Sequence, residues 1–305
     1  QTNDDANFTS KRGQAVDNQA TRISTITKDA NGNLVVTYKD GSTDTKPLSE
    51  FTSLNKQPAI DAINTAADNK IAEINSNTNA TAEEKAAATE KVNADKAKAL
   101  IAINDNSVTT KAALDNAKTS GTTAISNDNP VATKKDTAKA AIDSALREKE
   151  AAIDADNTLT TEEKNAAKAD AQARATAAKN NIDTATTNST VDNAKTTGVA
   201  DVESVNPQAS QKKTDAKNAV DEALKAKEAA IDANNDLTAE EKAKAKEDAK
   251  AKADAAKQAI DQSTTNAGVD KAKANGTTEV NNVNPTPVAK PAAKKAIDGA
   301  LKAKE

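Results

Sequence analysis

The 305-residue sequence contains no cysteine, no histidine, no methionine and no tryptophan. Without cysteine and histidine it lacks the usual thiol nucleophile, the imidazole base and the soft ligands of most metal sites. The absence of cysteine also favours an exported protein, which must avoid stray disulfides, although a short cytosolic chain could share it. We predict a non-enzymatic protein with no catalytic, cofactor-binding or metal-binding residue, and hence no cofactor.

Aromatic side chains are scarce as well. Phe8, Tyr38 and Phe51 are the three in the sequence, so residues 52–305 contain none. A core in that stretch must be built from alanine, isoleucine, leucine and valine, which bury less area per residue than aromatic groups. We therefore expect units of modest stability whose small side chains allow helices to approach closely.

Long runs of like-charged or of apolar residues are missing too. The net charge is −4, with lysines and acidic residues interspersed rather than grouped. The sequence has no stripe of basic residues interleaved with aromatic ones, so we do not expect it to bind nucleic acid. No apolar run approaches the roughly 18 residues of a membrane span. No signal peptide or sorting signal is recognisable. We expect a monomeric piece of a longer protein, beginning at Gln1, whose anchor lies elsewhere.

One stretch recurs along the sequence with a fixed period. Residues 159–205 return, with small changes, as residues 237–283, and a weaker copy precedes both. Glu-Glu-Lys triplets begin at Glu83, Glu162 and Glu240, a period of about 78 residues that is typical of a tandem array. The predicted parts are a flexible lead-in (1–22), a β-segment (23–56), three repeats (57–130, 131–207 and 208–285), and a linker with the first helix of a truncated fourth repeat (286–305).

The β-segment is predicted to be a three-stranded meander. Strands at about 23–27, 33–38 and 42–46 are separated by the turn signals Asn31-Gly32 and Asp40-Gly41. Three short strands bury little surface, so the meander must either lean on the first repeat or belong to a domain further upstream.

Each repeat reads as three helices. In the second repeat the first helix is expected over about 131–155, and a capping box formed by Thr160 and Glu163 begins the second. Thr81 with Glu84 and Thr238 with Glu241 repeat this signal. The predicted apolar positions are Ala138, Ile142, Ala145, Leu146 and Ile153 in the first helix, Ala167, Ala171, Ala178, Ile182 and Ala185 in the second, and Val191, Ala194, Gly198, Val202 and Val205 in the third.

Two features of the third helix bear on packing. Gly121, Gly198 and Gly276 recur on its apolar seam, which indicates either a close helix crossing or a break in the helix. An Asn-Pro pair then ends each repeat, at Pro130, Pro207 and Pro285. Proline suits a first helical turn, so the next helix is expected to begin there. The last linker contains two further prolines and should be the stiffest.

The acidic motifs favour structural roles. Residues 232–236 (Asp-Ala-Asn-Asn-Asp) resemble the start of a calcium loop, but Leu237 replaces the required glycine, so we predict a helix-ending turn. The similar sequence at Asp29 is predicted to be a hairpin turn. Glu162 and Glu163 could suggest acid-base chemistry, yet they fall in a first helical turn, where negative charge complements the helix dipole.

The segment AIDSALREKEAAIDADNTLTTEEKNAAKADAQARATAAKNNID (141–183), followed by TTNSTVDNAKTTGVADVESVNP (186–207), resembles a known family. It is similar to the Ala-, Lys- and Asp-rich tandem repeats, a domain of unknown function, of Gram-positive wall-anchored surface proteins such as extracellular matrix-binding protein homologues. The resemblance covers about residues 57–305. The first repeat departs from it, with Ala67 in the place of Leu146 and Asp128 in that of Val205.

This resemblance implies all-α bundles in an extracellular, wall-attached stalk with a role in adhesion or biofilm accumulation. Three helices in an up-down-up path leave a bundle at the end opposite their start, so three units in line would span on the order of 110 Å. The main hypothesis is a structural spacer that projects an adhesive region. The alternative is that the repeats themselves bind a host matrix protein or a neighbouring cell surface.

Overall fold

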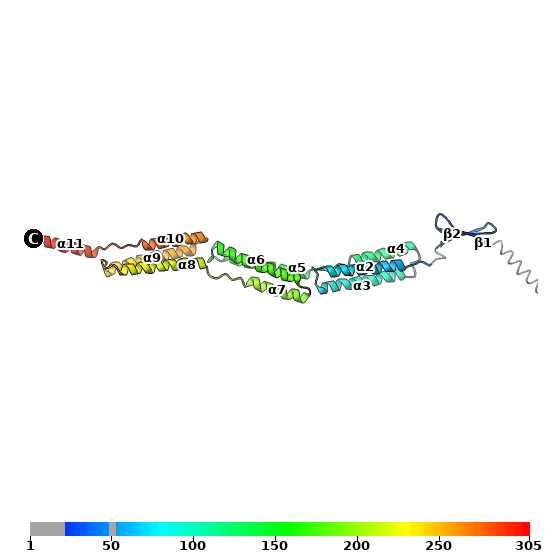
Figure 1. The fold of residues 1–305 in the computed structure, drawn as a ribbon, viewed down its shortest axis with the longest axis horizontal. Helices are drawn as coiled ribbons and strands as arrows, with labels where there is room; N and C mark the ends of the chain where they lie inside the picture. The colour runs from blue at the N-terminus through cyan, green and yellow to red at the C-terminus, as the bar shows by residue number, and fades with distance from the viewer. Residues whose placement is uncertain (1–21, 49–52) are drawn as a thin grey trace, which may run out of the picture. The chain divides into compact units, whose positions relative to one another are not determined.

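The computed structural model describes residues 22–48 and 53–305 (Figure 1). Apart from Arg22, the predicted lead-in lies outside these residues. The chain divides into two compact units, Gln1–Val131 and Ala132–Glu305, which are described separately below.

The first unit contains the predicted meander. Strands β1 (Ile23–Lys28), β2 (Asn33–Tyr38) and β3 (Thr43–Pro47) form an antiparallel sheet in the order β1-β2-β3. Gly32 and Gly41 adopt φ angles of 85° and 84° in the two turns, a conformation that glycine takes without steric cost. None of the residues in these three strands is buried: β1 is exposed, β2 is half-buried along its length, and β3 is almost entirely exposed.

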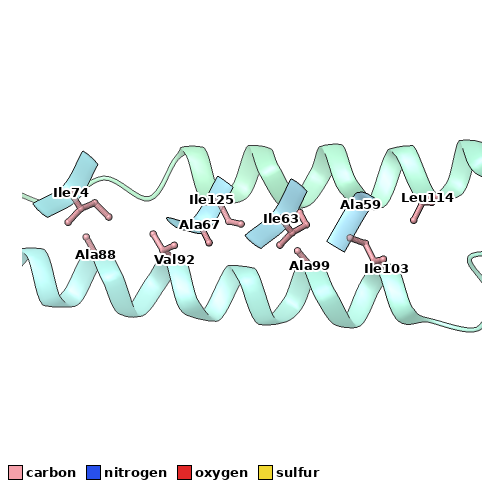
Figure 2. Packing of buried hydrophobic residues seen from close by; sticks show 10 residues of the cluster. All are labelled: Ala59, Ile63, Ala67, Ile74, Ala88, Val92, Ala99, Ile103, Leu114 and Ile125. Carbon is pink, nitrogen blue, oxygen red and sulfur yellow. The ribbon is translucent and has the colours of Figure 1, made fainter. Parts of the chain in front are cut away.

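The helices among the described residues of the first unit form one bundle. It consists of α2 (Gln57–Ser76), α3 (Ala82–Asn104) and α4 (Lys111–Ser126). Figure 2 shows Ala88, Val92, Ala99 and Ile103 of α3 pointing toward the side chains of α2 and α4. The core is aliphatic throughout, as the composition predicts.

The second unit contains two more bundles and a single helix. The bundles are α5 (Lys134–Ala155), α6 (Thr161–Thr184) and α7 (Asn188–Glu203), then α8 (Gln211–Asp232), α9 (Ala239–Gln262) and α10 (Asn266–Asn281), and α11 (Ala289–Lys302) follows. Most of the predicted apolar faces are buried. Ala175, absent from the predicted face of the second helix, is buried as well, whereas Ala167 is only half-buried.

Two recurring contacts fix the path of the chain in each bundle. The ammonium group of Lys135, at the start of α5, donates to the carbonyl of Asp183 at the end of α6 (2.7 Å). That of Lys149, near the end of α5, donates to Asn206 after α7 (3.2 Å). The chain therefore enters the bundle at one end and leaves at the other. Equivalent contacts join Lys56 to Asp105, Lys70 to Asn129, Lys213 to Asp261 and Lys227 to Asn284.

The recurring glycines lie at close helix crossings, which decides between the two readings of the sequence. Gly198 is buried within the continuous helix α7. A Cβ atom there would lie 2.5 Å from the Cβ of Ala178 and 2.8 Å from Cδ1 of Ile142. A Cβ at Gly121 would lie equally close to Ala99. Any larger residue would force the helices apart, and the alternative of a broken helix is wrong.

The expectation that each Asn-Pro pair begins the next helix is also wrong. Helix α8 begins at Gln211, four residues after Pro207, and α5 begins at Lys134 rather than near Val131. Val131 is consequently 72% exposed. The residues directly after each proline instead form a non-helical linker. Between the second and third repeats this linker ends at Ser210, whose hydroxyl caps α8 by accepting a hydrogen bond from the Lys213 amide (3.1 Å).

Candidate functional site: the Glu-Glu-Lys junction

The Glu-Glu-Lys triplet at residues 162–164 lies in the first turn of α6. Thr160 Oγ1 accepts a hydrogen bond from the Glu163 amide (3.2 Å), and Glu163 Oε1 accepts one from the Thr160 amide (3.1 Å). This reciprocal pair is the predicted capping box, and it is present in α3 and α9 as well. Thr160 is fully buried, so the start of the helix is tightly fixed.

Glu163 also makes contacts beyond its own helix. The Ser210 hydroxyl donates to Glu163 Oε1 (2.5 Å), and the Gln211 amide donates to Oε2 (3.1 Å). Ser210 and Gln211 are the N-cap and the first residue of α8, so one carboxylate satisfies orphan amides at two helix starts. The first helix of the third repeat is thereby attached to the second helix of the second repeat.

The ionisation of Glu163 reflects these contacts. Partial burial by itself would raise the pKa of the Glu163 carboxyl, but hydrogen bonds from Ser210 and Thr160 outweigh it and hold the pKa below its usual value. The carboxylate is therefore the form that the junction stabilises. Glu241 has a lowered pKa for the same kind of reason, because the amides of Thr238, Ala289 and Val288 donate to it.

A second set of contacts ties the start of α6 to the loop between α9 and α10. The amide and hydroxyl of Thr161 both donate to the carbonyl of Thr264 (2.8 and 3.1 Å). Glu162 Oε2 accepts from the Asn266 amide (3.0 Å). The start of α6 thus holds two separate points of the following bundle, and two points of attachment resist bending better than one.

The lysine of the triplet contacts the preceding helix of its own repeat, whereas the two glutamates contact the following repeat. Lys164 Nζ donates to the carbonyl of Asp154, near the end of α5 (2.8 Å), and Lys168 forms an ion pair with the Asp154 carboxylate (2.8 Å). Lys242 and Lys246 make the same contacts with Asp232. The triplet at 162–164 therefore joins the preceding helix of its own repeat to the helix that starts the next one.

The third triplet repeats the forward contact. Glu241 Oε1 accepts from the amides of Val288 and Ala289 at the start of α11 (3.1 and 3.0 Å). Glu163 and Ser210 are 47 residues apart, and so are Glu241 and Val288. The junction is thus a periodic feature of the second unit.

The acidic motifs weighed in the sequence form turns. Asp29 accepts from the amides of Asn31 and Asn33 in the first hairpin (2.9 and 2.7 Å). Asn234 accepts from the Asp236 amide after α8 (3.0 Å). Over residues 22–48 and 53–305 no group of three or more acidic side chains is placed to hold a metal ion. The helices described here include none with the length and apolarity to span a bilayer.

A family model matches most of the chain and shows which protein family it belongs to. The model of the family described as Domain of Unknown Function (DUF1542) matches residues 55–133, 134–210 and 212–288. The chain belongs to this family. Its three DUF1542 repeats correspond to the three bundles, and the resemblance expected from the sequence is confirmed. No curated protein and no solved structure matches the chain.

The sequence places Glu162 and Glu163 in the first turn of a DUF1542 helix but does not reveal their contacts with the next repeat. It does contain a usable signal. Thr133 and Ser210 are equivalent positions, directly before the first helix of the second and third repeats. A hydroxyl at such an N-cap position is expected to form hydrogen bonds. The pairing of Ser210 with Glu163 requires the three-dimensional arrangement.

Proposed function

We propose that the chain is a non-catalytic stalk or spacer of a bacterial cell-surface protein, built to hold an adhesive region away from the cell wall. The observation that carries this proposal is the junction between the second and third repeats. There Glu162, Thr161 and Glu163 fix the following bundle at two points. A joint held in this way favours a fixed spacing over free hinging.

The path of the chain within each bundle supports the same function. Since it enters at one end and leaves at the other, each added repeat lengthens the array instead of returning to its start. A 22-residue helix such as α5 contributes about 33 Å at about 1.5 Å per residue. Repetition of one bundle is an economical way to gain length, because each repeat needs only its neighbours to be stable.

We place this spacer outside the cell, in a wall-anchored protein of a Gram-positive bacterium. The proposal draws on the resemblance of the repeats to those of such surface proteins. The lack of cysteine agrees with export, since an exported chain without cysteine cannot form incorrect disulfides.

The junction can be tested with spin labels, because the chain has no native cysteine. Ala173→Cys in α6 and Ala251→Cys in α9 place labels at equivalent exposed positions of the two repeats. Pulsed electron resonance should give a narrow distance distribution that Glu163→Ala broadens. Glu241→Ala is the matched control, since it removes the same capping box without touching this junction. A broad distribution before any substitution would contradict the fixed joint.

The second candidate function is that the repeats themselves are adhesive. A shallow groove of about 370 Å³ lies between α3 and α4, lined by Ala99, Ala102 and Gly121 among others, and a similar one of about 420 Å³ lies between α9 and α10. Repeated grooves could bind a repeated ligand. Surface plasmon resonance of the whole chain over immobilised host matrix proteins separates the two functions. Micromolar or tighter binding favours adhesion, and no response favours the spacer.

A further inference from the structure

We propose that Asp95 and Asp128 of the first repeat form a binding site for one divalent cation of the oxygen-binding kind, with calcium the best fit. Asp95 lies on α3, and Asp128 follows α4 at the exit end of the bundle. The observation that carries the proposal is a buried carboxylate oxygen without a partner. Among residues 22–48 and 53–305, Asp128 Oδ2 is one of two buried side-chain oxygens that make no hydrogen bond.

Asp128 is buried more deeply than its contacts justify. The residue is 3% exposed, and a buried carboxylate is normally paired, hydrogen-bonded or bound to a metal. The Lys91 ammonium lies 3.6 Å from Oδ1, which is longer than a charge-assisted hydrogen bond of about 2.8 Å. The Lys91 side chain is also 69% exposed, so solvent weakens the attraction. The negative charge of Asp128 is therefore only partly compensated.

A second carboxylate faces the first. Lys91 and Asp95 are four residues apart on α3, so both lie on the side of the helix that meets Asp128. The charge of Asp95 and a hydrogen bond with it both raise the pKa of the Asp128 carboxyl, which places the two groups close together. The Lys98 ammonium, 3.4 Å from Asp95, belongs to a side chain that is 79% exposed. Two neighbouring carboxylates repel each other unless a proton or a cation lies between them.

The end of α4 increases the negative potential at this place. Asp128 is two residues beyond Ser126, the last residue of α4, and the carbonyl groups at a helix C-terminus carry partial negative charge. A basic residue in the last turn would offset that charge, but α4 has none. Lys70 donates to the adjacent Asn129 (2.6 Å) and to Glu73 (3.3 Å). A cation between the carboxylates would be stabilised by both of them and by the helix end.

The later repeats have a positive charge where the first repeat has Asp95. The equivalent residues are Arg174 in the second repeat and Lys252 in the third. The Arg174 guanidinium donates to the hydroxyl of Ser204 (3.1 Å), so it joins α6 to the end of α7. In the first repeat a bound ion would supply this positive charge and would join α3 to the segment after α4 through Asp128.

The ligand atoms select the type of ion. The sequence has no histidine or cysteine, and carboxylate oxygens suit hard cations such as calcium and magnesium. Calcium accepts about six to eight oxygen ligands in flexible geometry, so water can complete a site that has two carboxylates. Magnesium requires a nearly ideal octahedron and should bind less well. With two carboxylates and two lysines near by, we expect a Kd on the order of 1 mM, within the range of extracellular calcium modules.

Hydrogen exchange of the full chain tests the site, with calcium chloride compared against sodium chloride of equal ionic strength. Calcium at about ten times the expected Kd should slow exchange in α3 and α4 by about tenfold. Exchange in α5–α10 should not change. Asp95→Asn and Asp128→Asn should each abolish the response. Asp115→Asn is the matched control, because it removes an exposed carboxylate of the same repeat that pairs with Lys111 on its own helix.

Manganese, used as a paramagnetic probe, locates the ion. In nuclear magnetic resonance spectra it should broaden the amide signals of residues 94–96 and 127–129 before all others. The proposal is overturned if calcium leaves the first repeat unchanged or slows exchange equally in every repeat. It is also overturned if Asp128→Asn keeps the response. Stabilisation of the first repeat by acid but not by calcium would show that the two carboxylates hold a shared proton instead, and the cation site would then be rejected.

Discussion

The side chains at the exit end of the bundle differ between the first repeat and the two later ones. At three equivalent positions the later repeats have leucine, leucine and valine, whereas the first repeat has alanine, alanine and aspartate. The replaced positions are Leu146, Leu159 and Val205 in the second repeat, Leu224, Leu237 and Val283 in the third, and Ala67, Ala80 and Asp128 in the first. Val92, in the place of Ala171, restores part of the lost volume.

Asp128 shows what this difference costs. Its side chain is buried, the Lys91 ammonium lies 3.6 Å from Oδ1, and Oδ2 has no hydrogen-bond partner among residues 22–48 and 53–305. Burial raises the pKa of the Asp128 carboxyl, the neighbouring Asp95 raises it further, and Lys91 offsets only part of the shift. Both kinds of repeat nevertheless form the same bundle. The capping boxes and glycine crossings that they share therefore specify the fold, whereas the packing of this end sets the stability.

Val205→Asp should have the largest effect, because it gives the second repeat the defect of the first without its lysine. Asp170 occupies the place of Lys91, and the nearby Arg174 already binds Asp170 and Ser204. We expect the second repeat to lose about 3 kcal/mol, as measured by hydrogen exchange in residues 161–203. Val205→Ala, the control, should cost about 1.5 kcal/mol. Equal losses would show that the charge is irrelevant.

Asp128→Val makes the opposite change and should stabilise the first repeat by about 1–2 kcal/mol, because it removes a buried carboxylate oxygen that has no partner. Slower exchange in α2 and α3, with no change in α5–α10, is the expected result. Asp128→Asn separates the charge from the shape, and it should recover part of the gain. A destabilised first repeat would mean that the Lys91 ion pair matters more than burial.

Gly198→Ala tests the feature that all repeats share. The new methyl group would lie within 2.5 Å of the Ala178 side chain, so the helices must separate. We expect a net loss of about 1 kcal/mol, since overpacking outweighs the better helix propensity of alanine. Gly299→Ala is the matched control, because nothing lies within 4 Å of the position that its Cβ would take. That change should stabilise α11, and a loss there would undermine the packing explanation.

Lowering the pH should weaken the Glu163 junction and stabilise the first repeat around Asp128. This is the smallest of the predicted effects. The lowered pKa of Glu163 means that its contribution is complete above the ordinary value of 4.5 and is lost as pH falls through the folded-state pKa. The raised pKa of Asp128 means that its penalty is present at neutral pH and disappears as the carboxyl is protonated. Exchange corrected for its intrinsic rate, between pH 7 and 3, should show α8 weakening relative to the first repeat. Parallel changes would contradict both assignments.

Features that depend on local signals are predictable from the sequence. The three strands, the capping boxes and the apolar helix faces follow from neighbouring residues, and the structure confirms them. The glycine positions are also evident, but only the packing of the helices decides between a crossing and a break. Asp128 and Ala67 stand out as departures because the period makes equivalent positions comparable.

The junction is not predictable because its partners are far apart in the sequence. Glu163 meets Ser210 47 residues later, and Thr161 meets Thr264 103 residues later. Helical periodicity says nothing about such pairs. The misplaced helix starts have the same origin. Proline is compatible with a first turn, yet the cap at Ser210 and the carboxylate of Glu163 fix the start of α8 four residues further on.

Small-angle scattering of the whole chain tests the spacer most directly. The proposed spacer requires three bundles in line, and at about 33 Å for each bundle it predicts a maximum dimension above about 100 Å. A compact particle of 305 residues would have a radius of gyration of about 19 Å. A measured radius well above that value, with a long maximum dimension, is the predicted result. A radius as small as that of the compact particle would contradict the account.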